Sequence, residues 1–319
     1  MVGNAIPSRW SVLVLALVAG GCGSSRAPGL DAGEAPDGDA LEAPASDLAA
    51  AAPLSRREPL WKMLLPAATY ETRVELATLD DVEAVSASFG AEGYVLTAAL
   101  ATEAEATSYE LFGERETGTT EAFETRIALA SFADLDAKAA SLAADGFALT
   151  AVTKTFAGLT LFGVKPAGDP RTYVSKTLLV TGPSLDPAVT SLGSEGFVVT
   201  AMSWSGTGYR LFGVREAGPV TLIDAKVVEH DGVDFSTTVT ALGAQGYVVT
   251  AAIANSSNYA LAVARVAGTA GPRAIRVKGA IGAQLEDEAA AFGAAGMILE
   301  SVAAAGSVFT LFGSGHRAP

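Results

Sequence analysis

Residues 196–215 read GFVVTAMSWSGTGYRLFGVR, and four other stretches of the chain are variations on them. The pattern is typical of two β-strands joined by a turn of small residues. In each copy the second strand contains a leucine, and these leucines follow one another at intervals of 50 residues: Leu111, Leu161, Leu211, Leu261 and Leu311. A fixed period of this length indicates a repeat protein built from one supersecondary unit.

A further strand precedes each copy of this hairpin. Side chains of Tyr70, Thr72, Val74 and Leu76 fall on one face of such a strand, with charged residues between them, and this alternation predicts a half-buried strand. The equivalent strands are expected at 70–77, 123–130, 173–180, 223–228 and 275–280.

A short amphipathic helix is expected between the first strand and the hairpin. In the third unit Leu185, Val189 and Leu192 form an apolar stripe at helical spacing. The pairs Thr78 with Asp81 and Ser131 with Asp134 resemble capping boxes at the helix start. Glycines are expected to close the helices in the left-handed conformation: Gly93, Gly146, Gly196, Gly246 and Gly296. A second set, three residues earlier, would let each helix approach its sheet closely: Gly90, Gly193, Gly243 and Gly293.

The predicted fold is therefore α+β, with five tandem β-α-β-β repeats of about 50 residues, each a three-stranded sheet with one helix against it. Residues 70–319 hold the repeats, at about 70–118, 123–168, 173–218, 221–268 and 273–315.

The unit resembles a small bacterial domain family of unknown function. In that family a helix ends in Leu-Gly-x-x-Gly, Trp-Glu-Leu-Val follows, and a later strand ends in an aliphatic-Phe-x-x-basic run. The matching pieces here are residues 192–199, LGSEGFVV, and 211–215, LFGVR, with Phe or Tyr in place of the family's Trp. The resemblance covers all five units and implies a fold, without an activity.

Five such units can close or remain open. Neighbouring units must cover one another, because a single three-stranded unit has little stability alone. The first and fifth units keep their apolar stripes and have no polar cap, which favours closure into a five-bladed α/β propeller. The architecture by analogy is that of the penteins, which are five-fold α/β propellers built from units of similar size. An open curved array is the alternative.

The N-terminal region predicts a lipid anchor. Residues 1–22 have a sparse positive region and an apolar run too short to cross a bilayer, which is typical of a signal peptide. Ala19-Gly20-Gly21-Cys22 resembles a bacterial lipobox, which implies lipidation of Cys22, the one cysteine in the sequence; ordinary secretory cleavage is the alternative. Gly23 after the cysteine implies the outer membrane by analogy with lipoprotein sorting. The predicted location is the bacterial cell envelope, lipid-anchored at the outer membrane or in the periplasm, with palmitate among the attached acyl chains.

A linker and a short apolar segment separate the anchor from the repeats. Residues 23–57 are rich in Ala, Pro, Gly and acidic residues, and we expect them to be disordered. Residues 58–69 include LWKMLL at 60–65, and we expect this segment to pack on the repeats as an N-terminal clip, a partner-protein site being the alternative. The net charge of −14 argues against nucleic acid as a partner.

Recurring cations are the candidate binding residues. A cation occupies the same position in all five first strands: Arg73, Arg126, Lys176, Lys226 and Arg276. A second set follows the hairpins: Arg115, Lys165, Arg215 and Arg265. In a closed ring they would form circles of positive charge able to hold an anionic ligand near the axis. The alternative is that they pair with acidic strand neighbours on a solvated face.

Motifs for catalysis are scarce. Histidine occurs only as His230 and His316, and the chain has no Gly-x-Ser-x-Gly, phosphate-binding glycine loop or zinc pattern. The recurring Thr97, Thr150, Thr200 and Thr250 suit strand packing. We therefore expect no catalytic residue, metal or cofactor. The predicted function is a non-catalytic binding or interaction scaffold whose ligand is a protein or an anionic small molecule; the alternative is an envelope hydrolase that uses carboxylates or His230.

Overall fold

The computed structural model describes residues 69–101, 108–155, 158–230, 235–255, 258–268, 271–305 and 307–316. Each repeat in these ranges has the order strand, helix, strand, strand. The first repeat contains β1 (Tyr70–Thr78), α1 (Val82–Ala91), β2 (Val95–Ala101) and β3 (Ser108–Glu116). The second contains β4 (Phe123–Ala130), α2 (Leu135–Ala144), β5 (Ala148–Lys154) and β6 (Leu159–Pro166).

The remaining repeats follow the same order. The third contains β7 (Tyr173–Val180), α3 (Leu185–Ser194), β8 (Val198–Trp204) and β9 (Tyr209–Glu216). The fourth contains β10 (Ile223–His230), α4 (Phe235–Ala244), β11 (Val248–Asn255) and β12 (Asn258–Val266). The fifth contains β13 (Arg273–Ile281), α5 (Leu285–Ala294), β14 (Met297–Ala305) and β15 (Val308–His316). The predicted α+β repeat architecture is confirmed.

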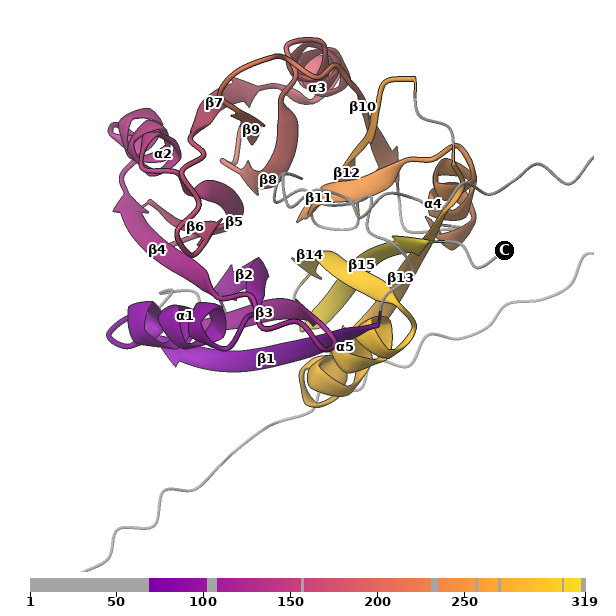
Figure 1. Ribbon diagram of the computed structural model, residues 1–319. Coiled ribbons are helices and arrows are strands. Elements are labelled where there is room, and N and C mark those ends of the chain that lie inside the picture. The colour runs from indigo at the N-terminus through magenta and orange to yellow at the C-terminus, as the bar shows by residue number, and fades with distance from the viewer. Residues whose placement is uncertain are drawn as a thin grey trace, which may run out of the picture. The chain divides into compact units, whose positions relative to one another are not determined.

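Each repeat forms its own antiparallel sheet of three strands, with the third strand in the middle, as in the order β1-β3-β2. The first strand lies at one edge of the sheet and the second strand at the other. Figure 1 shows the helices on the outside and the second strands β2, β5, β8, β11 and β14 nearest to one another.

The repeated Leu-Phe pair of the central strand explains how neighbouring repeats join. Leu211 packs with Leu192 on the helix of its own repeat, whereas Phe212 packs with Leu142 on the helix of the preceding repeat. Successive side chains of a strand point to opposite faces of the sheet. Each repeat thus contributes one helix to its own sheet, as predicted, and the helix of the preceding repeat covers the opposite face, a contact that the sequence did not predict.

The same packing connects the fifth repeat to the first. Phe112 of β3 is fully buried in a cluster with Phe292 and Leu285 of α5. The backbone amide of Leu299 in β14 also donates to Oε1 of Glu114 in β3 over 3.4 Å.

The helix glycines make a different contact from the predicted one. A Cβ atom added at Gly193 would lie 2.5 Å from the carbonyl oxygen of Ile223, and one added at Gly293 would lie 2.4 Å from the carbonyl oxygen of Tyr70. Glycine thus lets each helix approach the first strand of the next repeat, and α5 the first strand of repeat one, rather than its own sheet.

Helix ends follow the sequence signals in part. Gly93 and Gly196 have φ values of 86° and 83°, the left-handed conformation expected of a glycine that closes a helix. At the other end, α1 and α2 have Asp81 and Asp134 as N-caps, so the expected start at Thr78 and Ser131 was early. The two predicted pairs do bond to each other, but in a turn that precedes the helix.

Candidate functional site

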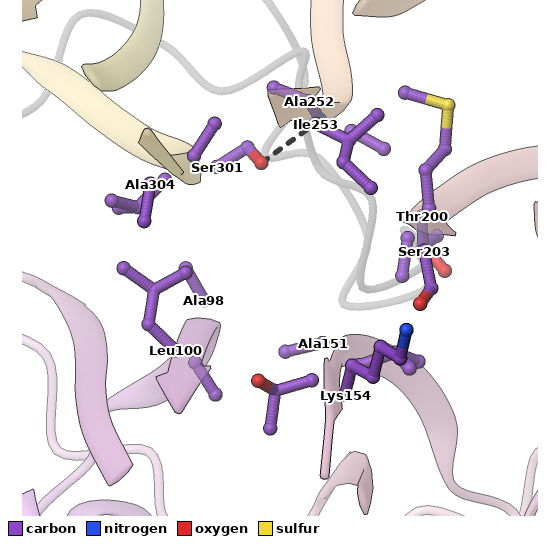
Figure 2. A pocket seen from close by; sticks show the side chains of 18 of the residues that line it. Ala98, Leu100, Ala151, Lys154, Thr200, Ser203, Ala252, Ile253, Ser301 and Ala304 are labelled. Carbon is purple, nitrogen blue, oxygen red and sulfur yellow. Dashed lines mark hydrogen bonds between the residues drawn. The ribbon is translucent and has the colours of Figure 1, made fainter. Parts of the chain in front are cut away.

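A cavity of about 330 Å³ lies where the second strands of all five repeats meet (Figure 2). It is lined by Thr97–Ala101 of β2, Thr150–Lys154 of β5, Thr200–Trp204 of β8, Ala251–Ala254 of β11 and Glu300–Ala304 of β14. Because these strands are sheet edges, their outer backbone groups and small side chains form the wall.

A β-bulge at the same position shapes each of these strands. Pairing with the central strand skips one residue in every repeat, and the skipped residue is Thr97, Thr150, Thr200, Thr250 or Glu300. A bulge leaves its extra residue out of the ladder and bends the strand. The Thr250 hydroxyl donates to the carbonyl oxygen of Ala262 over 3.3 Å, so the recurring threonine serves the local fold.

The wall has a polar and an apolar part. Lys154 and Ser203 lie together, on the side of the cavity opposite Ala304 in Figure 2. Nζ of Lys154 donates to the carbonyl oxygen of Trp204 over 3.5 Å. Larger apolar side chains and many alanines make up the apolar part; the larger side chains include Leu100, Val152, Met202, Ile253 and Val302. The cavity therefore combines one ammonium group, hydroxyls and the carboxyl of Glu300 with an apolar surface.

Hydrogen bonds between neighbouring repeats stabilise this wall. The Thr153 hydroxyl accepts from the backbone amide of Ala101 over 2.9 Å, and the Ser301 hydroxyl accepts from the amide of Ala252 over 3.0 Å. Each bond satisfies an edge-strand amide that pairing within its own sheet leaves free.

Two carboxyl groups meet where the fifth repeat contacts the first. Burial raises the pKa of Glu300, which lines the cavity, to about 8, and the Ser314 hydroxyl donates to its Oε1 over 2.8 Å. Burial also raises the pKa of Glu114 well above its ordinary value, and the nearby Glu300 charge adds to the effect. The Thr72 hydroxyl lies 2.9 and 3.0 Å from the two oxygens of Glu114. Burial raises the pKa of Tyr70 in β1, and the charges of Glu116, Glu300 and Glu114 add to the effect.

The nine predicted anion-binding cations lie elsewhere. All nine are described, and none is among the residues that line the cavity. Most lie in pairs over the aromatic residue that follows the helix: Arg126 and Lys165, for example, are 4.4 and 4.6 Å from the Phe147 ring centroid. Six of the nine also form ion pairs with acidic residues: Arg73, Arg115, Arg126, Lys165, Lys176 and Arg265.

The other three cations contact aromatic rings as well. Arg215 is 5.1 Å from the Phe197 ring centroid, Lys226 is 4.2 Å from that of Tyr247, and Arg276 is 5.0 Å from that of Phe292. The alternative interpretation, pairing with acidic neighbours, thus describes most of the set, and anion binding at these positions stays a prediction.

The remaining predicted residues give no second site. His230 ends β10, and its ring centroid is 5.1 Å from that of Phe235. In the part of the chain that the structure describes, no group of three or more His, Cys, Asp or Glu residues is placed to hold a metal ion. Cys22, the linker at 23–57 and the clip, apart from Thr69, lie outside the described residues. Within the described ranges no helix is long and apolar enough to span a membrane.

Sequence reasoning missed Lys154, Trp204 and Glu114 as site residues. A comparison of equivalent positions in the five repeats would have found these residues. Lys154 and Trp204 stand where the other three repeats have alanine, and Glu114 stands where the second and third repeats have valine. Glu300 was noticed only as a departure from the threonine of the other repeats. Neither protein-family models nor curated proteins nor solved structures give a match to this chain.

Proposed function

We propose that this chain is a non-catalytic binding scaffold of the bacterial cell envelope, anchored by a lipid at Cys22, whose repeats close into a five-bladed α/β propeller. Packing of α5 on β1, burial of Phe112 against Phe292, and the bond between Leu299 and Glu114 support closure. In an open array these groups of the first repeat would face water.

The cavity is the observation that carries the binding function. Its volume of about 330 Å³ is in the range of small-molecule sites. The repeats share one backbone there and differ in side chains, since Lys154, Trp204 and Glu300 each occur once among five equivalent strands. If the wall served folding alone, every repeat could have the alanine and threonine that most repeats have at these positions.

The wall chemistry favours a small ligand with one anionic group and a short apolar part. The ammonium group of Lys154 and the hydroxyl of Ser203 can bind a carboxylate, because charge-assisted hydrogen bonds are the stronger kind. Leu100 and Ile253 can cover an alkyl chain or ring. The proposed ligand class is therefore a short-chain carboxylate.

Replacing Lys154 by methionine is expected to weaken binding of such a carboxylate by about 10- to 100-fold, the value of one charge-assisted hydrogen bond. Calorimetry with butyrate, valerate and benzoate, each compared with its amide, measures this on the purified chain. Lys138→Met, an exposed lysine on α2, is the matched control and should leave binding unchanged. Equal binding of acid and amide, or no binding of either, contradicts the proposal.

The proposed anchor has a separate test. Cys22→Ser is expected to abolish incorporation of radiolabelled palmitate and to move the protein from the membrane fraction to the soluble fraction, because lipid chains hold it there. Ser24→Cys in the Cys22→Ser background keeps a cysteine nearby and should not restore labelling. Labelling or membrane retention of Cys22→Ser would rule out this anchor.

A further inference from the structure

Large apolar side chains are exposed along one rim of the first three repeats. Leu76, Leu129 and Leu179 near the ends of β1, β4 and β7 are 65%, 57% and 55% exposed, and Leu79 and Phe132 in the following turns are 45% and 49% exposed. We call these five residues the apolar rim. The three strands β1, β4 and β7 follow one another around the outer part of the repeats in Figure 1.

The rim residues occupy two equivalent positions in successive repeats, and Arg210 lies between two of them. The Phe132 ring centroid is 5.9 Å from the guanidinium carbon of Arg210, and Arg210 is the cross-strand partner of Leu179. Leu79 and Leu129 stand at the sequence positions of Phe132 and Leu179 one repeat earlier, and Leu129 pairs with Thr160, which stands at the position of Arg210. The row thus alternates between strand ends and turns over three successive repeats.

The fold does not require this apolar surface. At the position of Leu76, Leu129 and Leu179 the fourth and fifth repeats have Glu229 and Gly279. The equivalent strand forms in both of these repeats. At the position of Leu79 and Phe132 the third and fifth have Gly182 and Gly282. An exposed apolar row that the architecture can do without indicates an interaction surface.

The rim is bordered by negative charge. Exposed carboxylates occupy the turn and first helical residues beside Leu79 and Phe132: Asp80, Asp81, Glu83, Asp134 and Asp136. Two cations lie near the rim: Lys138 in the first turn of α2, and Arg210 beside Phe132 in the part of the rim that reaches the third repeat. A segment that combines apolar side chains with positive charge is the complementary occupant.

The chain contains such a segment just before its first described residue. Residues 56–65 read RREPLWKMLL, with Leu60, Trp61, Met63, Leu64 and Leu65 as apolar residues and three cations against one carboxylate. We propose that residues 56–65 bind the apolar rim of the first and second repeats, at Leu76, Leu79 and Leu129.

The covalent connection permits this contact. Leu60 is ten residues before Tyr70, and an extended chain of that length spans up to about 33 Å. Leu76 is six residues along β1 from Tyr70, about 20 Å in a strand. Because the segment and the rim belong to one chain, their effective concentration is high, and a modest apolar contact is sufficient.

Photo-crosslinking in intact membranes tests the contact. With p-benzoylphenylalanine replacing Leu79 in the full chain, irradiation is expected to yield crosslinked peptides that contain residues 56–65 of the same chain. The same probe replacing Glu229, the equivalent of Leu179 in a repeat without the apolar row, is the control and should not capture this segment. Crosslinks from Leu79 to another protein, to lipid or to a second copy, without residues 56–65, would overturn the proposal.

Trypsin cleavage gives a second measurement on the membrane-bound full chain. If the rim protects the segment, Leu79→Glu with Leu129→Glu should speed cleavage after Lys62 by about fivefold or more, since cleavage follows the open population. Glu229→Gln is expected to leave the rate unchanged. Cleavage after Lys62 at one rate in all three proteins would contradict docking on the rim, and circular dichroism of the double variant verifies that its repeats remain folded.

Discussion

Replacing Phe112 by alanine is expected to lower the free energy of unfolding by about 3–5 kcal/mol, the usual effect of removing a fully buried phenylalanine. Phe112 is fully buried against Phe292 and Leu285 of the fifth repeat. Chemical denaturation of the repeat region, followed by circular dichroism, measures the loss.

Phe212→Ala is the matched comparison, because Phe212 occupies the same strand position and packs with the second repeat, its neighbour in sequence. In a closed propeller the two losses are similar. In an open array Phe112 has no neighbouring helix to cover it, so its replacement would cost little while Phe212→Ala remained severe. A loss at Phe112 below about 1 kcal/mol, beside a normal loss at Phe212, would therefore rule out closure.

Sequence periodicity was sufficient to predict the secondary structure of the repeat unit, because each strand, helix and turn signal lies within a short stretch of the chain. Alternation along 123–130 and 173–180 predicted β4 and β7 with the observed bounds, and glycine after the apolar stripe predicted where the helices end. The contacts between repeats could not be predicted in this way. Gly193 and Phe212 indicate close packing, but the sequence does not show which segment each residue contacts. In the structure that segment belongs to a neighbouring repeat.

The site was missed for a related physical reason. A charge that recurs in every repeat attracts notice, yet Arg126 and Lys165 recur because each repeat has an aromatic ring and an acidic residue for them to contact. Residues that differ between repeats carry the individual chemistry. Lys154 and Glu300 are such residues, and only the assembly of five strands places them around one cavity.

Glu300→Thr, which installs the residue of the other four repeats, is expected to stabilise the protein at pH 8–9 and to change its stability much less at pH 5. Burial raises the pKa of Glu300 from 4.5 to about 8. Between these values the folded state holds a proton that the unfolded state has released. The contribution of Glu300 to the stability of the natural protein is therefore greatest below about pH 4.5 and is lost as the pH rises through 8.

The expected difference is on the order of 3–5 kcal/mol at pH 8–9, given about 1.4 kcal/mol for each unit of pKa. Urea denaturation of both proteins at pH 5, 7 and 9 measures it. Glu114 faces Glu300 and has a raised pKa of its own, so the variant should keep part of the pH dependence, and Glu114→Val in addition should remove more. Glu121→Gln, an exposed carboxylate before β4, controls for net charge. A Glu300→Thr protein with the same pH dependence as the natural chain would show that this carboxyl ionises without cost, and therefore that water reaches it in the folded protein.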